Sequence, residues 1–218
     1  MPANHLLIKL GPELIYSLVI LVLCLVIYIR TKEIYDLTKH KGIQFFRHSF
    51  LFFGLAYASR LILYFTMISN GTGPGVMRQL KSIIPVSNLV VAYFSTMAIL
   101  YLTYSIIHKK IDVEHFITFS NIIALIVAVV AFVSRSPLII SLIQLLLFLV
   151  IFVILIKNHQ KKKSSTLTLY LFIALFWFLN LFALVPTKRL NFAPNLLFQI
   201  ISIGLFVMIY YKVAKWIK

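Results

Sequence analysis

The stretch HKGIQFFRHSFLFFGLAYASRLILYF, residues 40–65, decides the fold class. Its first part is basic, with Lys41, Arg47 and His48, and the remainder is a run of large apolar residues interrupted by one charge, Arg60. About 20 apolar residues in an α-helix cross the roughly 30 Å hydrocarbon core of a bilayer. The stretch therefore predicts a membrane-spanning helix that is basic at one end. It also raises the question of what holds Arg60 in the apolar interior.

The same pattern recurs along the whole chain of 218 residues, of which 61% are hydrophobic and only 12% charged. Soluble domains carry about 25% charged residues, so the composition excludes an ordinary soluble domain. Apolar runs separated by charged or Gly/Pro-containing breaks predict seven spans, at residues 13–30, 46–68, 83–107, 115–134, 137–157, 166–186 and 193–214. We therefore expect residues 1–218 to form a single all-α, seven-transmembrane-helix bundle made of three hairpins plus one helix.

The connection between the second and third of these spans contains residues typical of a turn and a glycosylation sequon. The segment SNGTGPGVMRQLKS, residues 69–82, is expected to be a loop because it contains three glycines and a proline. Pro85 follows near the expected start of the third span, where a proline is tolerated. Asn70 begins an Asn-Gly-Thr glycosylation sequon, and its closeness to the membrane leaves modification open.

The basic residues are distributed unequally between the two sides of the predicted bundle. Fourteen lie in the connections after the first, third, fifth and seventh spans, and six lie in the connections on the other side. The positive-inside rule then places the N-terminus outside and the C-terminus in the cytoplasm. The net charge of +16 is thus explained by topology and by contact with anionic membrane lipids, and no nucleic-acid partner is expected.

Arg60 is the one charge predicted to lie deep in a span. It precedes Asn70 by about ten residues, which is roughly 15 Å along a helix. An arginine at that depth costs about 2.5 to 3.5 kcal/mol on insertion scales, so a partner is expected. Four of the five acidic residues fall in predicted cytoplasmic loops, which leaves Glu13 as the acidic candidate. An intramembrane charge of this kind is a candidate functional group.

Other polar residues are predicted to lie at a similar depth. Tyr57 and Tyr64 share a helix face with Arg60, and an amide side chain lies about five to seven residues from the outer end of each of four further spans. The predicted ligand-binding set is Arg60, Glu13, Tyr57, Tyr64, Asn88, Gln144, Asn180 and Gln199. Such residues would line an outward-facing polar pocket suited to an anionic small-molecule ligand. The alternative is that the amides only join helices, at about 0.6 to 2 kcal/mol each.

Several kinds of chemistry lack their residues in this sequence. There is no HExxH motif for zinc, and no intramembrane pair of aspartates or serine with a partner histidine at depth. The last span carries no lysine before Lys212 that could form a Schiff base, and Cys24 is the sole cysteine. We therefore expect a protein that is not an enzyme and has no metal or cofactor.

The segment YDLTKHKGIQFFRHSFLFFGLAYASR, residues 35–60, resembles a class of small, uncharacterised archaeal seven-helix proteins. More loosely, the whole arrangement resembles the seven-helix N-terminal sensor modules of prokaryotic histidine kinases. No kinase domain follows the last predicted span in this sequence. The resemblance therefore implies a membrane sensing or interaction module that acts through a separate partner.

Together these observations predict a multi-pass protein of the cell membrane that is a sensor or receptor-like module, with a cytoplasmic protein partner at its basic loops. Two alternatives stay open. One is a small secondary transporter or permease that uses the same pocket, and the other is a membrane assembly or lipid-interacting subunit in which the polar residues only join helices.

Overall fold

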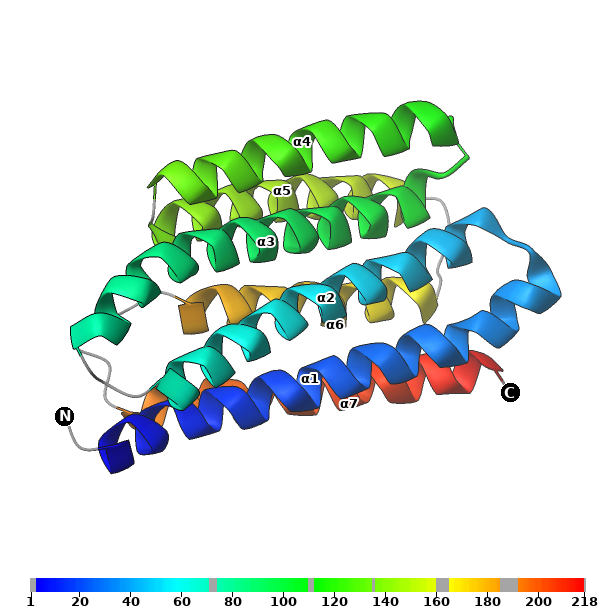
Figure 1. The fold of residues 1–218 in the computed structure, drawn as a ribbon. Coiled ribbons are helices and arrows are strands. Elements are labelled where there is room, and N and C mark those ends of the chain that lie inside the picture. Colours follow the sequence, from blue (N-terminus) through cyan, green and yellow to red (C-terminus); the bar gives the residue numbers. More distant parts are fainter. Residues whose placement is uncertain are drawn as a thin grey trace.

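The protein is all-helical, which confirms the predicted fold class (Figure 1). The computed structural model describes residues 3–70, 74–109, 112–134, 136–159, 165–184 and 192–217. Within these ranges the helices are α1 (Ala3–Thr38), α2 (Lys41–Asn70), α3 (Pro74–Ile107), α4 (Val113–Ser134), α5 (Pro137–His159), α6 (Ser165–Leu184) and α7 (Phe192–Ile217). Each predicted span lies within one helix or overruns it by no more than two residues.

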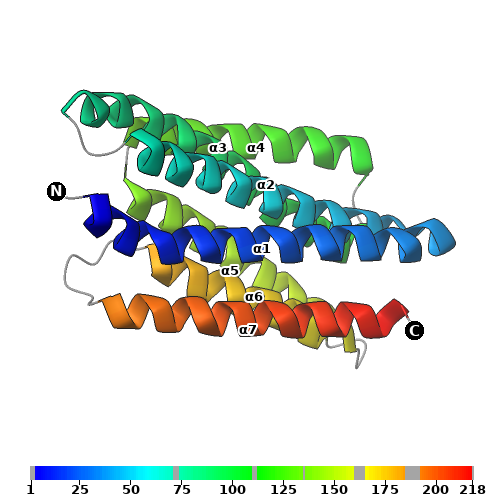
Figure 2. The same ribbon diagram turned by 60° about the horizontal axis from the view of Figure 1, so that its bottom comes forward.

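Six of the helices form a ring, and the seventh lies outside it. Helix α1 packs between α2 and α7, α2 packs on α3, and α5 and α6 close the ring between α3 and α7. Helix α4 packs against α3 and α5 from outside the ring. The N-terminus and the C-terminus lie at opposite ends of the bundle in two views (Figures 1 and 2). We call the end at which α2 ends and α3 and α5 begin the N-terminal end.

Five helices contain segments that are long and apolar enough to cross a membrane, within the residues that the structure describes. These segments are Leu10–Thr38, Lys41–Ser69, Ser82–Ile107, Val113–Ser134 and Leu196–Lys215. Helices α5 and α6 carry shorter apolar segments, Ile139–Ile154 and Thr168–Leu179. Length and apolar composition on this scale are those of a membrane protein.

The first connection is much shorter than the sequence suggested. Residues 31–45 were expected to form a cytoplasmic loop, but α1 continues to Thr38 and α2 begins at Lys41. The turn is made by Lys39, whose φ of 50° lies in the left-handed region, and the Lys39 amide donates a hydrogen bond of 2.7 Å to the Tyr35 carbonyl. A left-handed residue directly after a helix is a common way to end it. Only Lys39 and His40 therefore separate the two helices.

The outer connection also differs from the prediction. Residues 69–82 were expected to be a loop, but α2 extends to Asn70 and α3 begins at Pro74. Proline is favoured in the first turn of a helix because its missing amide hydrogen would have no partner there. The residues after Pro74 then continue the helix, so Pro85 lies inside α3 and not at its start.

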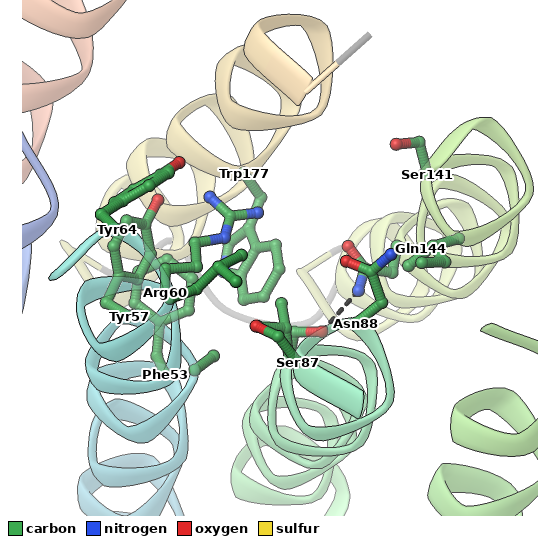
Figure 3. Close-up of a pocket in the computed structure, with 14 residues that line it drawn as sticks. Phe53, Tyr57, Arg60, Tyr64, Ser87, Asn88, Ser141, Gln144 and Trp177 are labelled. Carbon is green, nitrogen blue, oxygen red and sulfur yellow. Dashed lines mark hydrogen bonds between the residues drawn. The ribbon is translucent and has the colours of Figure 1, made fainter. Parts of the chain in front are cut away.

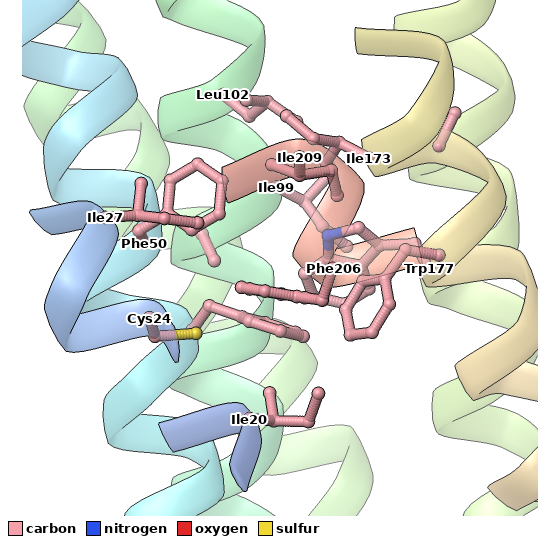
Figure 4. Packing of buried hydrophobic residues seen from close by; sticks show 14 of the residues in the cluster. Ile20, Cys24, Ile27, Phe50, Ile99, Leu102, Ile173, Trp177, Phe206 and Ile209 are labelled. Atoms are coloured by element: carbon pink, nitrogen blue, oxygen red, sulfur yellow. The ribbon is translucent and has the colours of Figure 1, made fainter. Parts of the chain in front are cut away.

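Aromatic and branched aliphatic side chains fill the centre of the ring (Figure 4). The ring of Phe53 on α2 lies 4.6 Å from Trp177 on α6 and is stacked on Phe206 on α7, with an interplanar angle of 8°. Phe176 and Phe206 meet edge to face with ring centroids 4.7 Å apart. Pairs of this kind contribute about 0.5 to 1.5 kcal/mol beyond the area that they bury. Large rings thus bridge helices on opposite sides of the bundle.

Candidate ligand-binding cavity

A cavity of about 150 Å³ lies between α2, α3, α5 and α6. Its lining comes from the second half of α2, the first half of α3, the first turns of α5 and the second half of α6, so the cavity lies toward the N-terminal end of the bundle. The side chains with polar groups that line it are Tyr57, Arg60, Tyr64, Ser87, Asn88, Ser95, Ser141, Gln144 and Trp177 (Figure 3). Side chains such as Phe53 and Ile140 make the rest of the wall apolar.

Arg60 extends from α2 into this cavity and is half-buried (Figure 3). Its guanidinium carbon lies 5.3 Å from the centre of the Tyr57 ring. A cation over an aromatic face is stabilised by about 0.5 to 2 kcal/mol, which offsets part of the cost of placing a charge in an apolar setting. The ion pairs among the described residues are Lys39–Asp36 and His115–Asp112, and Arg60 takes part in neither. The expected ion pair between Arg60 and Glu13 is therefore not formed.

Glu13 reaches the same cluster indirectly. The carboxylate of Glu13 on α1 accepts a hydrogen bond from the Tyr64 hydroxyl on α2. Tyr16 and Tyr57 make a second link between α1 and α2, with a side-chain hydrogen bond and ring centroids 6.0 Å apart. Tyr64 thus occupies the position near Glu13 that the sequence had assigned to Arg60. The arginine keeps its charge directed into the cavity.

Two amide side chains predicted to converge do so. Gln144 on α5 is 3% exposed and donates a hydrogen bond to the Ser95 hydroxyl on α3, and that hydroxyl in turn donates to the Ala92 carbonyl. Asn88 lies two turns before Ser95 on the same face of α3 and also lines the cavity. A hydrogen bond between α3 and α5 thus fixes one wall of the cavity.

Two serine hydroxyls beside the cavity have no hydrogen-bond partner among the described residues. The Ser87 and Ser141 side-chain oxygens are buried and unsatisfied, and both residues line the cavity. Ser141 is 8% exposed, and its hydroxyl is directed toward the cavity (Figure 3). A buried hydroxyl left without a partner costs about 1 to 3 kcal/mol. Both hydroxyls therefore retain unused hydrogen-bonding capacity at the wall of the cavity.

The structure brings together five of the eight predicted residues, namely Tyr57, Arg60, Tyr64, Asn88 and Gln144. Glu13 adjoins them through Tyr64. Gln199 is buried in α7 but is not part of the lining, and the side chain of Asn180 lies outside the described residues. That these residues bind a ligand stays a prediction.

The sequence did not lead us to include Ser87, Ser95, Ser141 or Trp177 in the predicted site, although all four line the cavity. One signal could have found two of these residues. Ser95 follows Asn88 by seven positions and Ser141 precedes Gln144 by three, and both spacings keep side chains on one helix face. No comparable signal marks Trp177, because its face of α6 is lined by other large apolar residues.

Phe53 and Trp177 separate the cavity from a smaller space further along the bundle. That second cavity measures about 20 Å³, and its lining includes Phe53, Trp177, Phe206 and Ile209. Both Phe53 and Trp177 therefore have one side on each cavity. We call this pair the aromatic floor of the polar cavity.

The fold and the cavity define the class of this protein: an all-helical membrane protein with a small cavity inside the bundle, lined by both polar and apolar side chains. No family model matches the chain, and no solved structure matches it significantly. An uncharacterised protein of Archaeoglobus fulgidus is 30% identical over 212 residues, which cover 94% of this chain and 92% of that protein. The chain belongs to the same family as that protein.

Proposed function

We propose that this protein is a non-enzymatic sensor or receptor-like module of the cell membrane whose cavity binds a small anionic ligand at Arg60. The observation that carries the proposal is that Arg60 and Ser141 line one cavity while, among the described residues, the guanidinium has no ion pair and the buried hydroxyl has no hydrogen-bond partner. An anion would neutralise Arg60 and accept a hydrogen bond from Ser141. One molecule would then offset both the cost of the unpaired charge and the cost of the unsatisfied hydroxyl.

The proposed topology has seven spans, with the N-terminus outside and the C-terminus in the cytoplasm. The excess of basic residues at the opposite end supports this orientation. Since the cavity lies toward the N-terminal end, the ligand would enter from outside. Occupancy would be passed along the helices to the basic connections, where a cytoplasmic protein partner would bind.

The aromatic floor favours a sensor over a transporter. A transporter needs a polar path to the second side of the membrane. The second cavity beyond Phe53 and Trp177 is lined almost entirely by apolar side chains and is about 20 Å³ in volume. A closed cavity of this kind suits a ligand that binds and leaves by the same route.

Labelling from outside tests the site. In a Cys24→Ala background, Asn88→Cys and Ser141→Cys are expected to react with a membrane-impermeant maleimide added to intact cells. The matched control is Val213→Cys, a fully buried position near the C-terminal end of α7 and far from the cavity along the bundle. It is expected not to react. Lack of labelling at both cavity positions would contradict the proposal of an outward-facing pocket.

Binding and flux separate the three functions. Purified protein is tested with acetate and benzoate, by a shift in thermal unfolding and by uptake into proteoliposomes, with protein-free liposomes as the control. A sensor binds at least one anion without added flux, and Arg60→Gln abolishes that binding. Arg47→Gln is the control and should keep it, because in the unmutated protein Arg47 stacks at 4.1 Å on the Tyr28 ring. Flux that Arg60→Gln abolishes would indicate a transporter. A constant co-purifying partner, with no effect of Arg60→Gln, would indicate an assembly subunit.

A further inference from the structure

The cavity has two chemically different sides. Arg60 and the Ser141 hydroxyl supply a cation and a hydrogen-bond donor, whereas the aromatic floor and the side chains of Ala56 and Val91 supply apolar surface. A ligand that is only charged, such as a bare inorganic anion, would leave the apolar part in contact with water. A ligand that is only apolar would leave the charge and the hydroxyl unsatisfied. The lining therefore suits a molecule with one anionic end and one apolar end.

The volume and shape narrow the apolar end. An engineered apolar cavity of about 150 Å³ in another protein binds one benzene ring, and the cavity here has about the same volume. The floor consists of Phe53 and Trp177, which offer aromatic edges and faces to a flat ring. A planar carboxylate is also the shape that a guanidinium binds with two parallel hydrogen bonds.

We propose that the ligand is a small aromatic carboxylate, with its single ring on the aromatic floor of Phe53 and Trp177 and its carboxylate between Arg60 and Ser141. This inference rests on the proposed anion site, and it adds the class of the anion. The ring replaces water on the apolar side, and the carboxylate accepts hydrogen bonds from the guanidinium and the hydroxyl.

The chain carries its own reporter for this test. It has two tryptophans, Trp177 in the aromatic floor and Trp216 near the end of α7. A Trp216→Phe variant leaves Trp177 as the sole tryptophan, so its fluorescence reports on the floor alone. The full-length variant is placed in lipid nanodiscs and titrated with sodium benzoate. Benzamide, which has the ring without the charge, and acetate, which has the charge without the ring, are the matched compounds.

Benzoate is expected to change the Trp177 emission in a saturable way. Benzamide and acetate should bind with an affinity lower by about tenfold or more, because benzamide lacks the carboxylate contacts and acetate lacks the ring contacts. The benzoate response should disappear in Arg60→Gln. Ala56→Leu, which fills the cavity, should lower the affinity for benzoate more than the affinity for acetate. Ala58→Leu lies on the same helix but outside the lining, so it should change neither affinity.

The outcomes separate this inference from the proposed function. Acetate binding as tightly as benzoate, with both lost in Arg60→Gln, would overturn the aromatic class and leave the anion site in place. Benzamide binding as tightly as benzoate would overturn the pairing of the carboxylate with Arg60. No saturable response to either anion, in fluorescence and in thermal unfolding, would overturn both proposals.

Discussion

At the scale of single residues, Ser141 tests whether an unsatisfied hydroxyl contributes to the proposed ligand binding or to the stability of the fold. Its oxygen is buried without a hydrogen-bond partner, so Ser141→Ala removes an unsatisfied group. We expect the thermal stability of the ligand-free protein to be unchanged or to rise by about 1 kcal/mol. Benzoate affinity should fall severalfold, by the loss of about 1 kcal/mol of hydrogen bonding.

Ser105 is the matched control for Ser141. Its hydroxyl lies 2.6 Å from the Leu102 carbonyl and 2.8 Å from the Tyr170 hydroxyl, and it joins α3 to α6. Ser105→Ala should therefore lower the free energy of unfolding by about 1 to 3 kcal/mol, because the buried Tyr170 hydroxyl loses its hydrogen bond to Ser105. Calorimetry of the two variants in one detergent checks the contrast. A larger loss in Ser141→Ala than in Ser105→Ala would contradict it.

Gly42 shows a second residue-level constraint, at the other end of the bundle. A Cβ added there would lie 3.0 Å from ring atoms of both His40 and His108. Gly42→Ala should therefore push the imidazoles apart and cost about 1 to 3 kcal/mol. A Cβ added at Gly204 in α7 meets nothing within 4 Å, so Gly204→Ala should be neutral or gain up to about 1 kcal/mol from helix propensity. Equal melting temperatures of the two variants would show that no close packing exists at Gly42.

At the scale of elements, histidine and lysine side chains gather at the junction between the start of α2 and the end of α3. The His40 and His108 rings lie 4.7 Å apart. Burial lowers the pKa of His108, the hydrogen bond to the Ser105 carbonyl raises it, and electrostatic interactions with the His40 ring and with the ammonium groups of Lys109 and Lys41 lower it further. The net direction is downward, so the folded protein holds His108 neutral at a pH where an unfolded histidine is already protonated.

This shift predicts how stability depends on pH. An unfolded histidine titrates near pH 6.5, above the folded His108, so the unfolded state takes up the proton first on acidification. The free energy of unfolding should therefore fall as the pH drops through about 6.5. Thermal unfolding between pH 8 and pH 5 should show this slope reduced in His108→Gln. His115→Gln, at an exposed site paired with Asp112, is the control. An unchanged slope in His108→Gln would contradict the prediction.

The elements also show which parts of the site the sequence could predict. Apolar runs located every helix, and depth along antiparallel helices placed Asn88 and Gln144 correctly at one height. Depth does not tell the direction in which a residue faces. Gln199 lies at a similar height yet belongs to α7, which is separated from α2 by α1 in the ring. The partner of Glu13 was missed for a related reason, since Tyr64 and Arg60 share a helix face and either could have reached it.

At the scale of the whole molecule, α4 differs from the other helices because it lies outside the ring. Helix α4 packs only on α3 and α5, among the helix pairs in contact, and much of its remaining surface is apolar and exposed. Residues such as Phe119, Leu125 and Val133 would face lipid if this surface lies in a membrane. The cavity lies on the opposite side of α3, so the lipid-facing surface and the polar site are separated by one helix.

The orientation of the bundle is the last testable property, and it follows from the whole charge distribution. The end that holds Lys39 carries most of the basic residues, whereas Ser69 lies at the N-terminal end near the cavity. Both residues are exposed, and both stand at ends of helices. In a Cys24→Ala background, Ser69→Cys should react with an impermeant maleimide in intact cells. Lys39→Cys should react only after the membrane is permeabilised.

The same pair of variants carries its own control, because each position must react in permeabilised cells to show that it is accessible at all. The reversed pattern would place the cavity on the cytoplasmic side. The proposed ligand would then be an anion of the cytoplasm, and the basic residues would face outward, against the usual bias. Because Ser69 lies only about one and a half helical turns beyond Tyr64, the side of the membrane on which Ser69 reacts is also the side on which the cavity lies. One labelling experiment thus decides from which compartment a ligand reaches Arg60.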